Sequence, residues 1–149
     1  MKSILFLTIL LSVLLLIFGC AAQTNLSDYQ PKSAEEKEVV DVLVKTEKAI
    51  QNRNLGEFMA CFHDNATIQL PKYGYEKQFV SKRQYEEFLE SGMWAEYSAG
   101  VLANPTITMS GDKATLICFS PGENVLIRHT FNLIKENEKW SIIKYRYTW

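Results

Sequence analysis

The side chain best suited to acid–base chemistry is His129, in the strand-like stretch NVLIRHTFNLIK. Strand alternation places four apolar side chains on the same face as His129: Val125, Ile127, Phe131 and Leu133. This is the more apolar of the two faces, so we expect it to point into the protein. Because imidazole titrates near neutral pH, His129 is the best candidate for a general base. A hydrogen-bonded histidine in the core or at its rim fits the same pattern and is the commoner case.

Proton abstraction beside a carbonyl also needs a group that stabilises the developing charge. The predicted strands place no second acid on the face that carries His129. His63 and Asp64 are adjacent, but they lie in the polar stretch HDN, where we expect Asp64 to be a turn and capping residue. The sequence has no Cys-x-x-C pair and no His/Cys cluster, so it predicts neither a metal site nor a cofactor. The catalytic signal is therefore weak.

A different chemistry is indicated at Cys20, which ends an apolar run. The run from Ile4 to Phe18 is fifteen residues long, carries no charge and directly follows Lys2 and Ser3. A membrane-spanning helix needs about 20 apolar residues, so this pattern is typical of a secretion signal that is removed. We expect residues 1–19 to be that signal peptide, with an uncleaved anchor as the less favoured alternative.

Cys20 is preceded by Ile17, Phe18 and Gly19 and followed by Ala21, and this arrangement resembles the lipobox of bacterial lipoproteins. The resemblance implies that the thiol of Cys20 is acylated and that the chain is cut in front of it. Two or more acyl chains hold a protein stably on a membrane. The predicted location is therefore the bacterial cell envelope, outside the cytoplasm. The alternative is an ordinary cleavage site with an unmodified Cys20.

The other two cysteines are Cys61, in an apolar helical pattern, and Cys118, in a strand pattern. A disulfide can form outside the cytoplasm, whereas cysteine is also a common buried apolar residue. Two buried thiols are at least as well supported as a disulfide, and both interpretations stay open at this point.

Composition predicts one globular domain, since 47% of the residues are hydrophobic and 22% are charged. Residues 20–32 are polar and hold a proline, so we expect a lipidated cysteine and a flexible tether, with the folded domain over 33–149. Helix starts are predicted by three residue pairs of the capping-box type: Ser33 with Glu36, Asn54 with Glu57, and Ser81 with Gln84.

Strand signals follow the second predicted helix over residues 67–70 and 76–80, and they continue almost without a break after residue 100. Short turn stretches, GD, PGEN and ENE, divide this last part into four strands of an antiparallel meander. The predicted class is α+β, with N-terminal helices packed in the concave face of a curved antiparallel sheet.

Two short motifs accompany this order of elements: Phe62, Asp64, Ala66 and Ile68 after the second helix, and Trp140 with Ile142 near the end. Together they are similar to the nuclear transport factor 2-like fold, also called cystatin-like. The resemblance implies a cone-shaped sheet with an apolar pocket in its mouth. Such folds carry isomerases, dehydratases, cyclases and binding modules, so the fold does not choose the function.

We expect the pocket to be lined by Phe58, Phe62, Trp94, Leu116, Cys118, Ile127, His129, Phe131, Trp140 and Ile142. Three aromatic residues alternate at the end of the chain: Tyr145, Tyr147 and Trp149. On an outer face they would form a contact surface for a second copy or a protein partner. A bulge in the strand would instead turn them inward, and both outcomes are equally supported.

The charge balance excludes one class of partner. Sixteen Lys and Arg face 17 Asp and Glu, and no basic stripe interrupts this balance, so nucleic-acid binding is not expected. The leading hypothesis is an anchored lipoprotein that binds a small apolar ligand or a protein partner without catalysis. The alternative is an isomerase, dehydratase or cyclase that acts on a small apolar substrate with His129 as general base.

Overall fold

The computed structural model describes residues 24–70, 78–96, 101–122 and 124–148. Its helices and helical turns are η1 Leu26–Asp28, α2 Ala34–Gln51, α3 Leu55–Met59, α4 Lys82–Phe88, η2 Leu89–Met93 and α5 Trp94–Glu96. Its strands are β1 Phe62–Gln69, β2 Phe79–Ser81, β3 Ala103–Ser110, β4 Lys113–Pro121, β5 Leu126–Glu136 and β6 Lys139–Thr148. The predicted signal peptide and Cys20 lie outside these residues. Within them, no helix is long and apolar enough to span a membrane.

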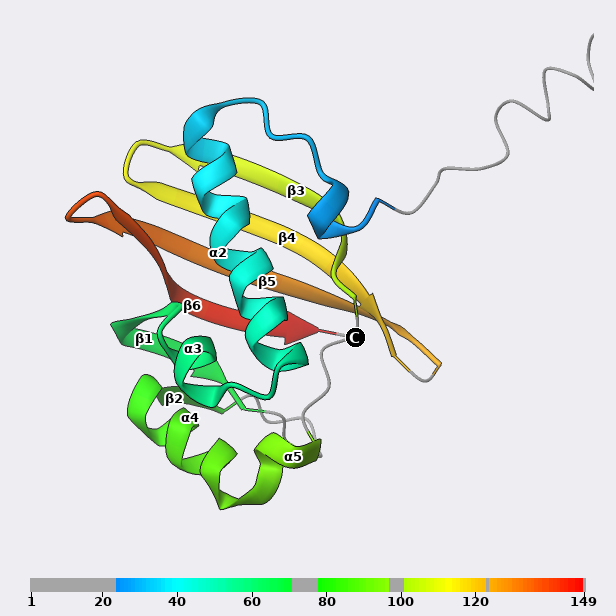
Figure 1. Ribbon diagram of the computed structural model, residues 1–149, viewed down its shortest axis with the longest axis vertical. Coiled ribbons are helices and arrows are strands. Elements are labelled where there is room, and N and C mark those ends of the chain that lie inside the picture. Colours follow the sequence, from blue (N-terminus) through cyan, green and yellow to red (C-terminus); the bar gives the residue numbers. More distant parts are fainter. Residues whose placement is uncertain (1–23, 71–77, 97–100, 123, 149) are drawn as a thin grey trace, which may run out of the picture.

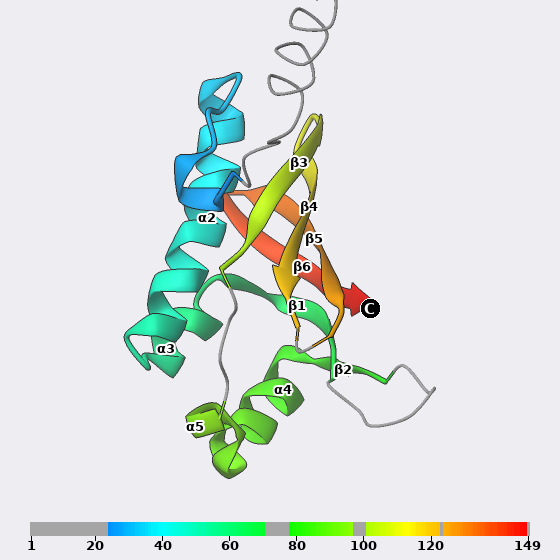
Figure 2. The same cartoon turned by 90° about the vertical axis from the view of Figure 1, so that its right-hand side faces the viewer.

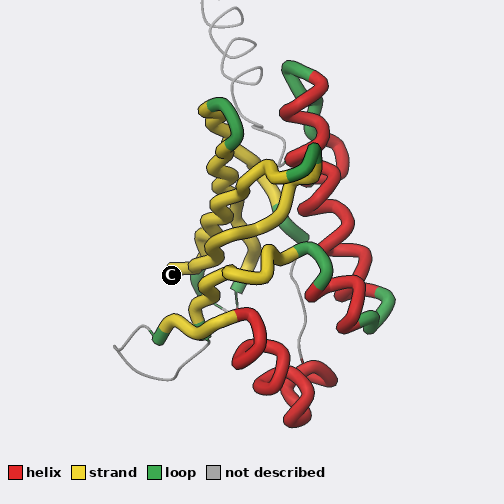
Figure 3. Tube along the Cα trace, turned by 90° about the vertical axis from the view of Figure 1, so that its left-hand side faces the viewer, coloured by secondary structure: helices red, strands yellow, loops and turns green. Residues whose placement is uncertain are grey.

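The strands form one curved sheet in the order β2-β1-β6-β5-β4-β3. All neighbours in it are antiparallel except β1 and β6, which run parallel. Helix α2 crosses one face of the sheet, with α4 and α5 at one end (Figure 1). Figures 2 and 3 show the helices gathered on that side, with no described helix on the opposite face. The predicted α+β class is confirmed.

Helix α2 begins where its cap predicts, because the Ser33 hydroxyl accepts a hydrogen bond from the Glu36 amide at 3.0 Å. Val39 and Leu43 are fully buried on its sheet-facing side, as an amphipathic helix requires. The reciprocal hydrogen bond of a capping box, from the Ser33 amide to the Glu36 side chain, is absent. The Glu36 carboxylate instead accepts from the Tyr29 hydroxyl at 2.8 Å and from the Lys32 amide.

The segment before α2 corrects the described part, residues 24–32, of the tether expected over residues 20–32. Leu26 is fully buried, and its amide donates to the Leu102 carbonyl oxygen at 2.8 Å. The Asn104 amide donates to the Thr24 carbonyl oxygen at 2.7 Å. Residues 24–32 therefore pack on the domain, because an apolar leucine and backbone pairing outweigh the polar composition of the segment.

Strand β1 corrects the expected turn at Asp64. It begins at Phe62, which is paired with Ile142 of β6, so His63 and Asp64 are strand residues. The Ile142 amide donates to the Cys61 carbonyl oxygen at 2.9 Å, just where α3 gives way to the strand. Pairing with β6 starts the strand five residues earlier than its local sequence pattern indicates.

The aromatic end of the chain follows the bulge alternative. Strand β6 pairs Lys144 with Asn132 but Ile142 with Leu133, which leaves Ile143 as an extra residue. Tyr145 lies opposite Phe131 and is 6% exposed, and Tyr147 lies opposite His129. Both tyrosines therefore belong to the inner face, not to an outer contact surface. Trp149 lies outside the described residues.

The two described cysteines do not form a disulfide. Cys61 and Cys118 are both buried and both are free thiols.

The inner face of β5 is largely as predicted, with Phe131 and Leu133 buried. Val125 is the exception, since β5 begins at Leu126 and Val125 is 51% exposed in the preceding turn.

Candidate functional site

His129 stands on the inner face of β5 with both ring nitrogens engaged. Its Nε2 lies 2.8 Å from the Ser120 hydroxyl and its Nδ1 lies 2.9 Å from the Tyr145 hydroxyl. Burial lowers the pKa of His129 to about 4, so the ring is neutral at physiological pH. A neutral imidazole has one N–H donor and one acceptor, and the two hydroxyls supply the complementary groups. The histidine is thus held in place as a neutral, polar part of the interior.

Aromatic rings extend this position into a continuous surface, which we call the aromatic wall: His129, Phe131, Tyr145 and Tyr147. Phe131 and Tyr145 stack with centroids 4.7 Å apart and ring planes 13° apart. The ring of His129 is 6.0 Å from Tyr145 and 6.5 Å from Tyr147. Stacked rings with hydroxyl groups at their edges offer a broad apolar contact and a few polar handles.

The inner face is less buried toward one end of β5. Leu133 is 1% exposed and Phe131 is 4% exposed, whereas His129 and Ile127 are partly exposed, and Val125, in the turn before the strand, is half exposed. The more exposed end of the wall therefore lies at the end of the sheet that carries the β4–β5 turn.

An inward carboxylate from α2, which the strand pattern does not predict, lies near this site. Glu47 accepts a hydrogen bond from the Leu102 amide at 2.9 Å, and burial raises the pKa of its carboxyl group. Burial, with a smaller contribution from the charge of Glu47, raises the pKa of the Cys118 thiol to about 12. Cys118 is paired with His129 across β4 and β5. The sequence feature that could have indicated this inward acid is a glutamate among the apolar residues of α2.

The helical residues expected at the pocket opening form a second aromatic cluster. Phe58 lies 5.2 Å from Phe62 and 5.2 Å from Trp94 between ring centroids. The Trp94 indole N–H donates to the Arg53 carbonyl oxygen at 3.2 Å, which joins α5 to the turn between α2 and α3. Phe58 and Phe62 are buried, while Trp94 is partly exposed.

The remaining expected pocket residues separate into two groups. Leu116 and Cys118 are fully buried beside the aromatic wall. Trp140 lies elsewhere, because its indole N–H donates to Glu38, near the start of α2, at 3.2 Å. Ile142 is fully buried opposite Leu133. The structure thus brings Ile127, His129 and Phe131 together on one face, and ligand binding there stays a prediction.

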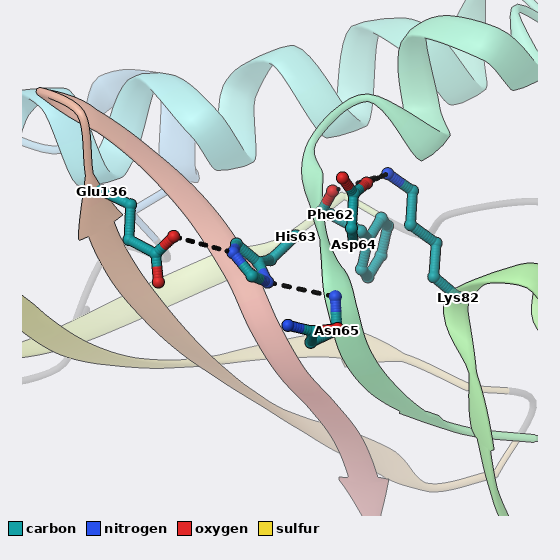
Figure 4. A network of polar contacts seen from close by, with 6 residues as sticks. All are labelled: Phe62, His63, Asp64, Asn65, Lys82 and Glu136. Atoms are coloured by element: carbon teal, nitrogen blue, oxygen red, sulfur yellow. Dashed lines mark hydrogen bonds and ion pairs between the residues drawn. The ribbon is translucent and has the colours of Figure 1, made fainter.

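A polar hollow of about 370 Å³ lies between β1, the start of α4 and the β5–β6 turn. Its histidine, His63, accepts from the Asn65 amide at Nδ1 and so carries its proton on Nε2, which lies 3.1 Å from Glu136 (Figure 4). Lys82 contacts Asp64 at 3.0 Å and the Phe62 carbonyl oxygen at 2.9 Å.

The charged groups of this hollow form ion pairs or hydrogen bonds with one another. Hydrogen bonding to Lys82 lowers the pKa of Asp64, as expected for a carboxylate beside an ammonium group. The contacts join β1 to α4 and to the β5–β6 turn, so they have a structural use. Nowhere in the described ranges do three or more histidine, cysteine, aspartate or glutamate side chains converge as a metal site would require.

Comparison with known proteins identifies the type of fold. No protein-family model matches the chain, and no curated protein matches it. Among solved structures, a nuclear transport factor 2-like protein of unknown function from Shewanella baltica is 16% identical with a TM-score of 0.63, over 80% of this chain and 97% of that one. The chain has the nuclear transport factor 2-like fold.

Two other structures with this fold give the same result. A nuclear transport factor 2-like protein of unknown function from Pseudomonas putida is 18% identical, with a TM-score of 0.61, over 80% of this chain and 89% of that one. A protein of unknown function with a cystatin-like fold from Nostoc punctiforme is 17% identical, with a TM-score of 0.60, over 79% and 93%. At these identities the nuclear transport factor 2-like likeness concerns the fold alone.

Proposed function

We propose that this chain is a lipoprotein of the bacterial cell envelope whose nuclear transport factor 2-like domain binds a small apolar molecule without transforming it. The lipid anchor is supported by the lipobox-like residues Ile17 to Cys20 after an uncharged apolar run. Acylation of Cys20 holds the folded domain outside the cytoplasm.

The aromatic wall carries the ligand-binding part of this proposal. Its rings stack on one another, and its outer members, His129 and Tyr147, stay partly exposed although they lie on the inner face. A neutral histidine costs little to cover with an apolar ligand, whereas a charged one would resist desolvation. The pKa of about 4 at His129 therefore favours binding over base catalysis at neutral pH.

Mass spectrometry of the full chain, purified under native conditions and extracted with organic solvent, tests ligand binding. We expect a bound small molecule, and we expect Ile127→Gln to reduce its amount because Ile127 lies on the inner face beside the wall. Ile134→Gln is the matched control, since this partly exposed isoleucine of the same strand lies on the outer face. Equal retention by the two variants, or no extracted molecule at all, contradicts the proposal.

Incorporation of radiolabelled palmitate tests the anchor independently. The wild-type chain is expected to take up label and to sediment with membranes, and Cys20→Ala is expected to do neither. A Cys20→Ala protein with undiminished label rules out this attachment site.

A second candidate function is an isomerase, dehydratase or cyclase-like activity on a small apolar substrate, with His129 as general base. The observation in its favour is Glu47, which supplies the inward acid that the strands lack, with a raised carboxyl pKa. Incubation of the extracted molecule with fresh protein tests this activity. A change in its mass or retention time that is lost in His129→Ala and Glu47→Gln, with folding intact, would favour the enzyme.

A further inference from the structure

The N-terminal segment is fixed to one end of the sheet. Thr24 exchanges two hydrogen bonds with Asn104: the Asn104 amide donates to the Thr24 carbonyl oxygen at 2.7 Å, and the Thr24 amide donates to Asn104 Oδ1 at 3.2 Å. Leu26 follows, fully buried and paired with Leu102. The chain is therefore held against the start of β3 from Thr24 onward.

Only four peptide units connect Thr24 to Cys20. A fully extended chain spans at most about 3.6 Å per residue, so this connection reaches no more than about 14 Å. With a lipid on Cys20, Thr24 lies within about that distance of the bilayer surface, and the start of β3 is held beside Thr24. A tether of the length expected from composition, ending at residue 32, would have left the domain free to turn away.

The same end of the molecule exposes aliphatic side chains. Val101 is 54% exposed, Val125 is 51% exposed and Leu126 is 58% exposed. The sheet register places them together at one end, since Ala103 pairs with Phe119 and Pro121 pairs with Leu126. In Figure 1 the start of β3, the β4–β5 turn and the end of β6 all lie on the right-hand side, which faces the viewer in Figure 2.

We infer that this anchor end, defined by Thr24, Val101, Val125 and Leu126, docks on the phospholipid bilayer. The inference rests on the proposed acylation of Cys20. The short connection keeps the three aliphatic side chains at a high local concentration beside the lipid surface, where a weak apolar contact is enough. The four residues that define this end are uncharged, so the contact depends on apolar burial and little on salt.

Fluorescence of the full, acylated chain reconstituted into vesicles of phosphatidylethanolamine and phosphatidylglycerol tests this docking. A nitrobenzoxadiazole label on Leu126→Cys reports the anchor end, and the same label on Asp112→Cys reports the exposed β3–β4 turn at the opposite end of the sheet. Cys61 and Cys118 are buried and stay unlabelled in the folded protein. We expect a blue-shifted emission and several-fold weaker quenching by aqueous iodide at position 126 than at 112.

Insertion of a long Gly/Ser linker between Ala22 and Gln23 provides a matched control. It keeps the anchor and the folded domain but lets the domain leave the surface, so quenching at position 126 should rise toward that at 112. Unchanged protection in the linker variant overturns the role of the short connection. Equal quenching at both positions without the linker, in protein that floats with the vesicles, overturns the docking alone. Wild-type protein that does not float overturns the anchor and the docking together.

Discussion

At the scale of single residues, the decisive feature is His129, a neutral histidine with both ring nitrogens hydrogen-bonded. His129 loses hydration in the interior, and Ser120 and Tyr145 replace the lost hydrogen bonds. These partners suit the neutral ring, and burial penalises the charged one, so the pKa falls from 6.5 to about 4. The same burial makes His129 a weaker base than an exposed histidine.

This pKa predicts acid sensitivity. Between pH 6.5 and 4 the unfolded chain binds a proton at His129 while the folded chain does not, so the free energy of unfolding falls as the pH falls. We expect the wild type to lose about 2–3 kcal/mol more than His129→Gln over this range. Urea unfolding of both proteins at pH 7 and pH 4 measures the difference. The same pH dependence in both proteins would contradict a buried neutral histidine.

Glu47 predicts the opposite pH dependence. Its pKa is raised by burial, so the folded state resists ionisation and loses stability as the pH rises above 4.5, the usual value of the group. Glu47→Gln keeps an acceptor for the Leu102 amide and removes the charge. We therefore expect this variant to have a higher urea midpoint than wild type at pH 7, with the gap closing by pH 4. The exposed Glu57→Gln is the control, and a lower midpoint for Glu47→Gln at pH 7 would count against this account.

At the scale of elements, long-range pairing overrides local signals at both ends of the chain. The segment before α2 reads as a polar tether, yet Leu26 and Tyr29 attach it to the domain. Burial next to Glu36 and a hydrogen bond to it raise the pKa of the Tyr29 hydroxyl to about 12. The segment is thus part of the folded domain from Thr24 onward.

Leu26→Ala should release this segment. Removal of a fully buried leucine side chain costs about 2–5 kcal/mol when the rest of the structure cannot relax. Because the segment is terminal, we expect the loss to appear mainly as local opening. Hydrogen exchange should accelerate at the amides of Leu26 and Asn104, with a small change in global stability. Leu126→Ala, at an exposed leucine, should leave these amides protected.

Strand β6 is the second example, because its pairing with β5 determines which way its side chains point. Regular alternation from Ile142 would send Tyr145 outward, but the extra residue at Ile143 returns it to the inner face. The aromatic wall exists only because of this bulge. Nothing in the local residue types distinguishes a bulged strand from a regular one here.

At the scale of the whole molecule, the anchor end and the more exposed end of the aromatic wall coincide. The wall is least buried toward Val125, and Val125 is also part of the anchor end. Docking would therefore place the more exposed end of the wall next to the bilayer. We expect the molecule found by mass spectrometry to partition into lipid, with retention reduced by detergent washing. A strongly water-soluble ligand would contradict this arrangement.

The sequence by itself determined the elements and their class. Caps at Ser33, Asn54 and Ser81 mark real helix starts, because capping needs only residues three apart. Alternation over residues 103–148 predicted four strands and the inner position of Phe131 and Leu133, since the side-chain period of a strand is local. The lipobox-like residues are equally local, which is why the anchor is a proposal made from sequence.

Tertiary structure decided the rest of the candidate site. The inward Glu47, the early start of β1, the bulge in β6 and the attachment of Thr24 to Asn104 all depend on partners far apart in the chain, eighty residues in the last case. Burial and backbone pairing between distant segments outweigh local preference where the two disagree. Local pattern therefore predicted the class and the approximate bounds of the helices and strands, and only packing decided where β1 begins, which polar groups face the aromatic wall and how the segment before α2 attaches to the domain.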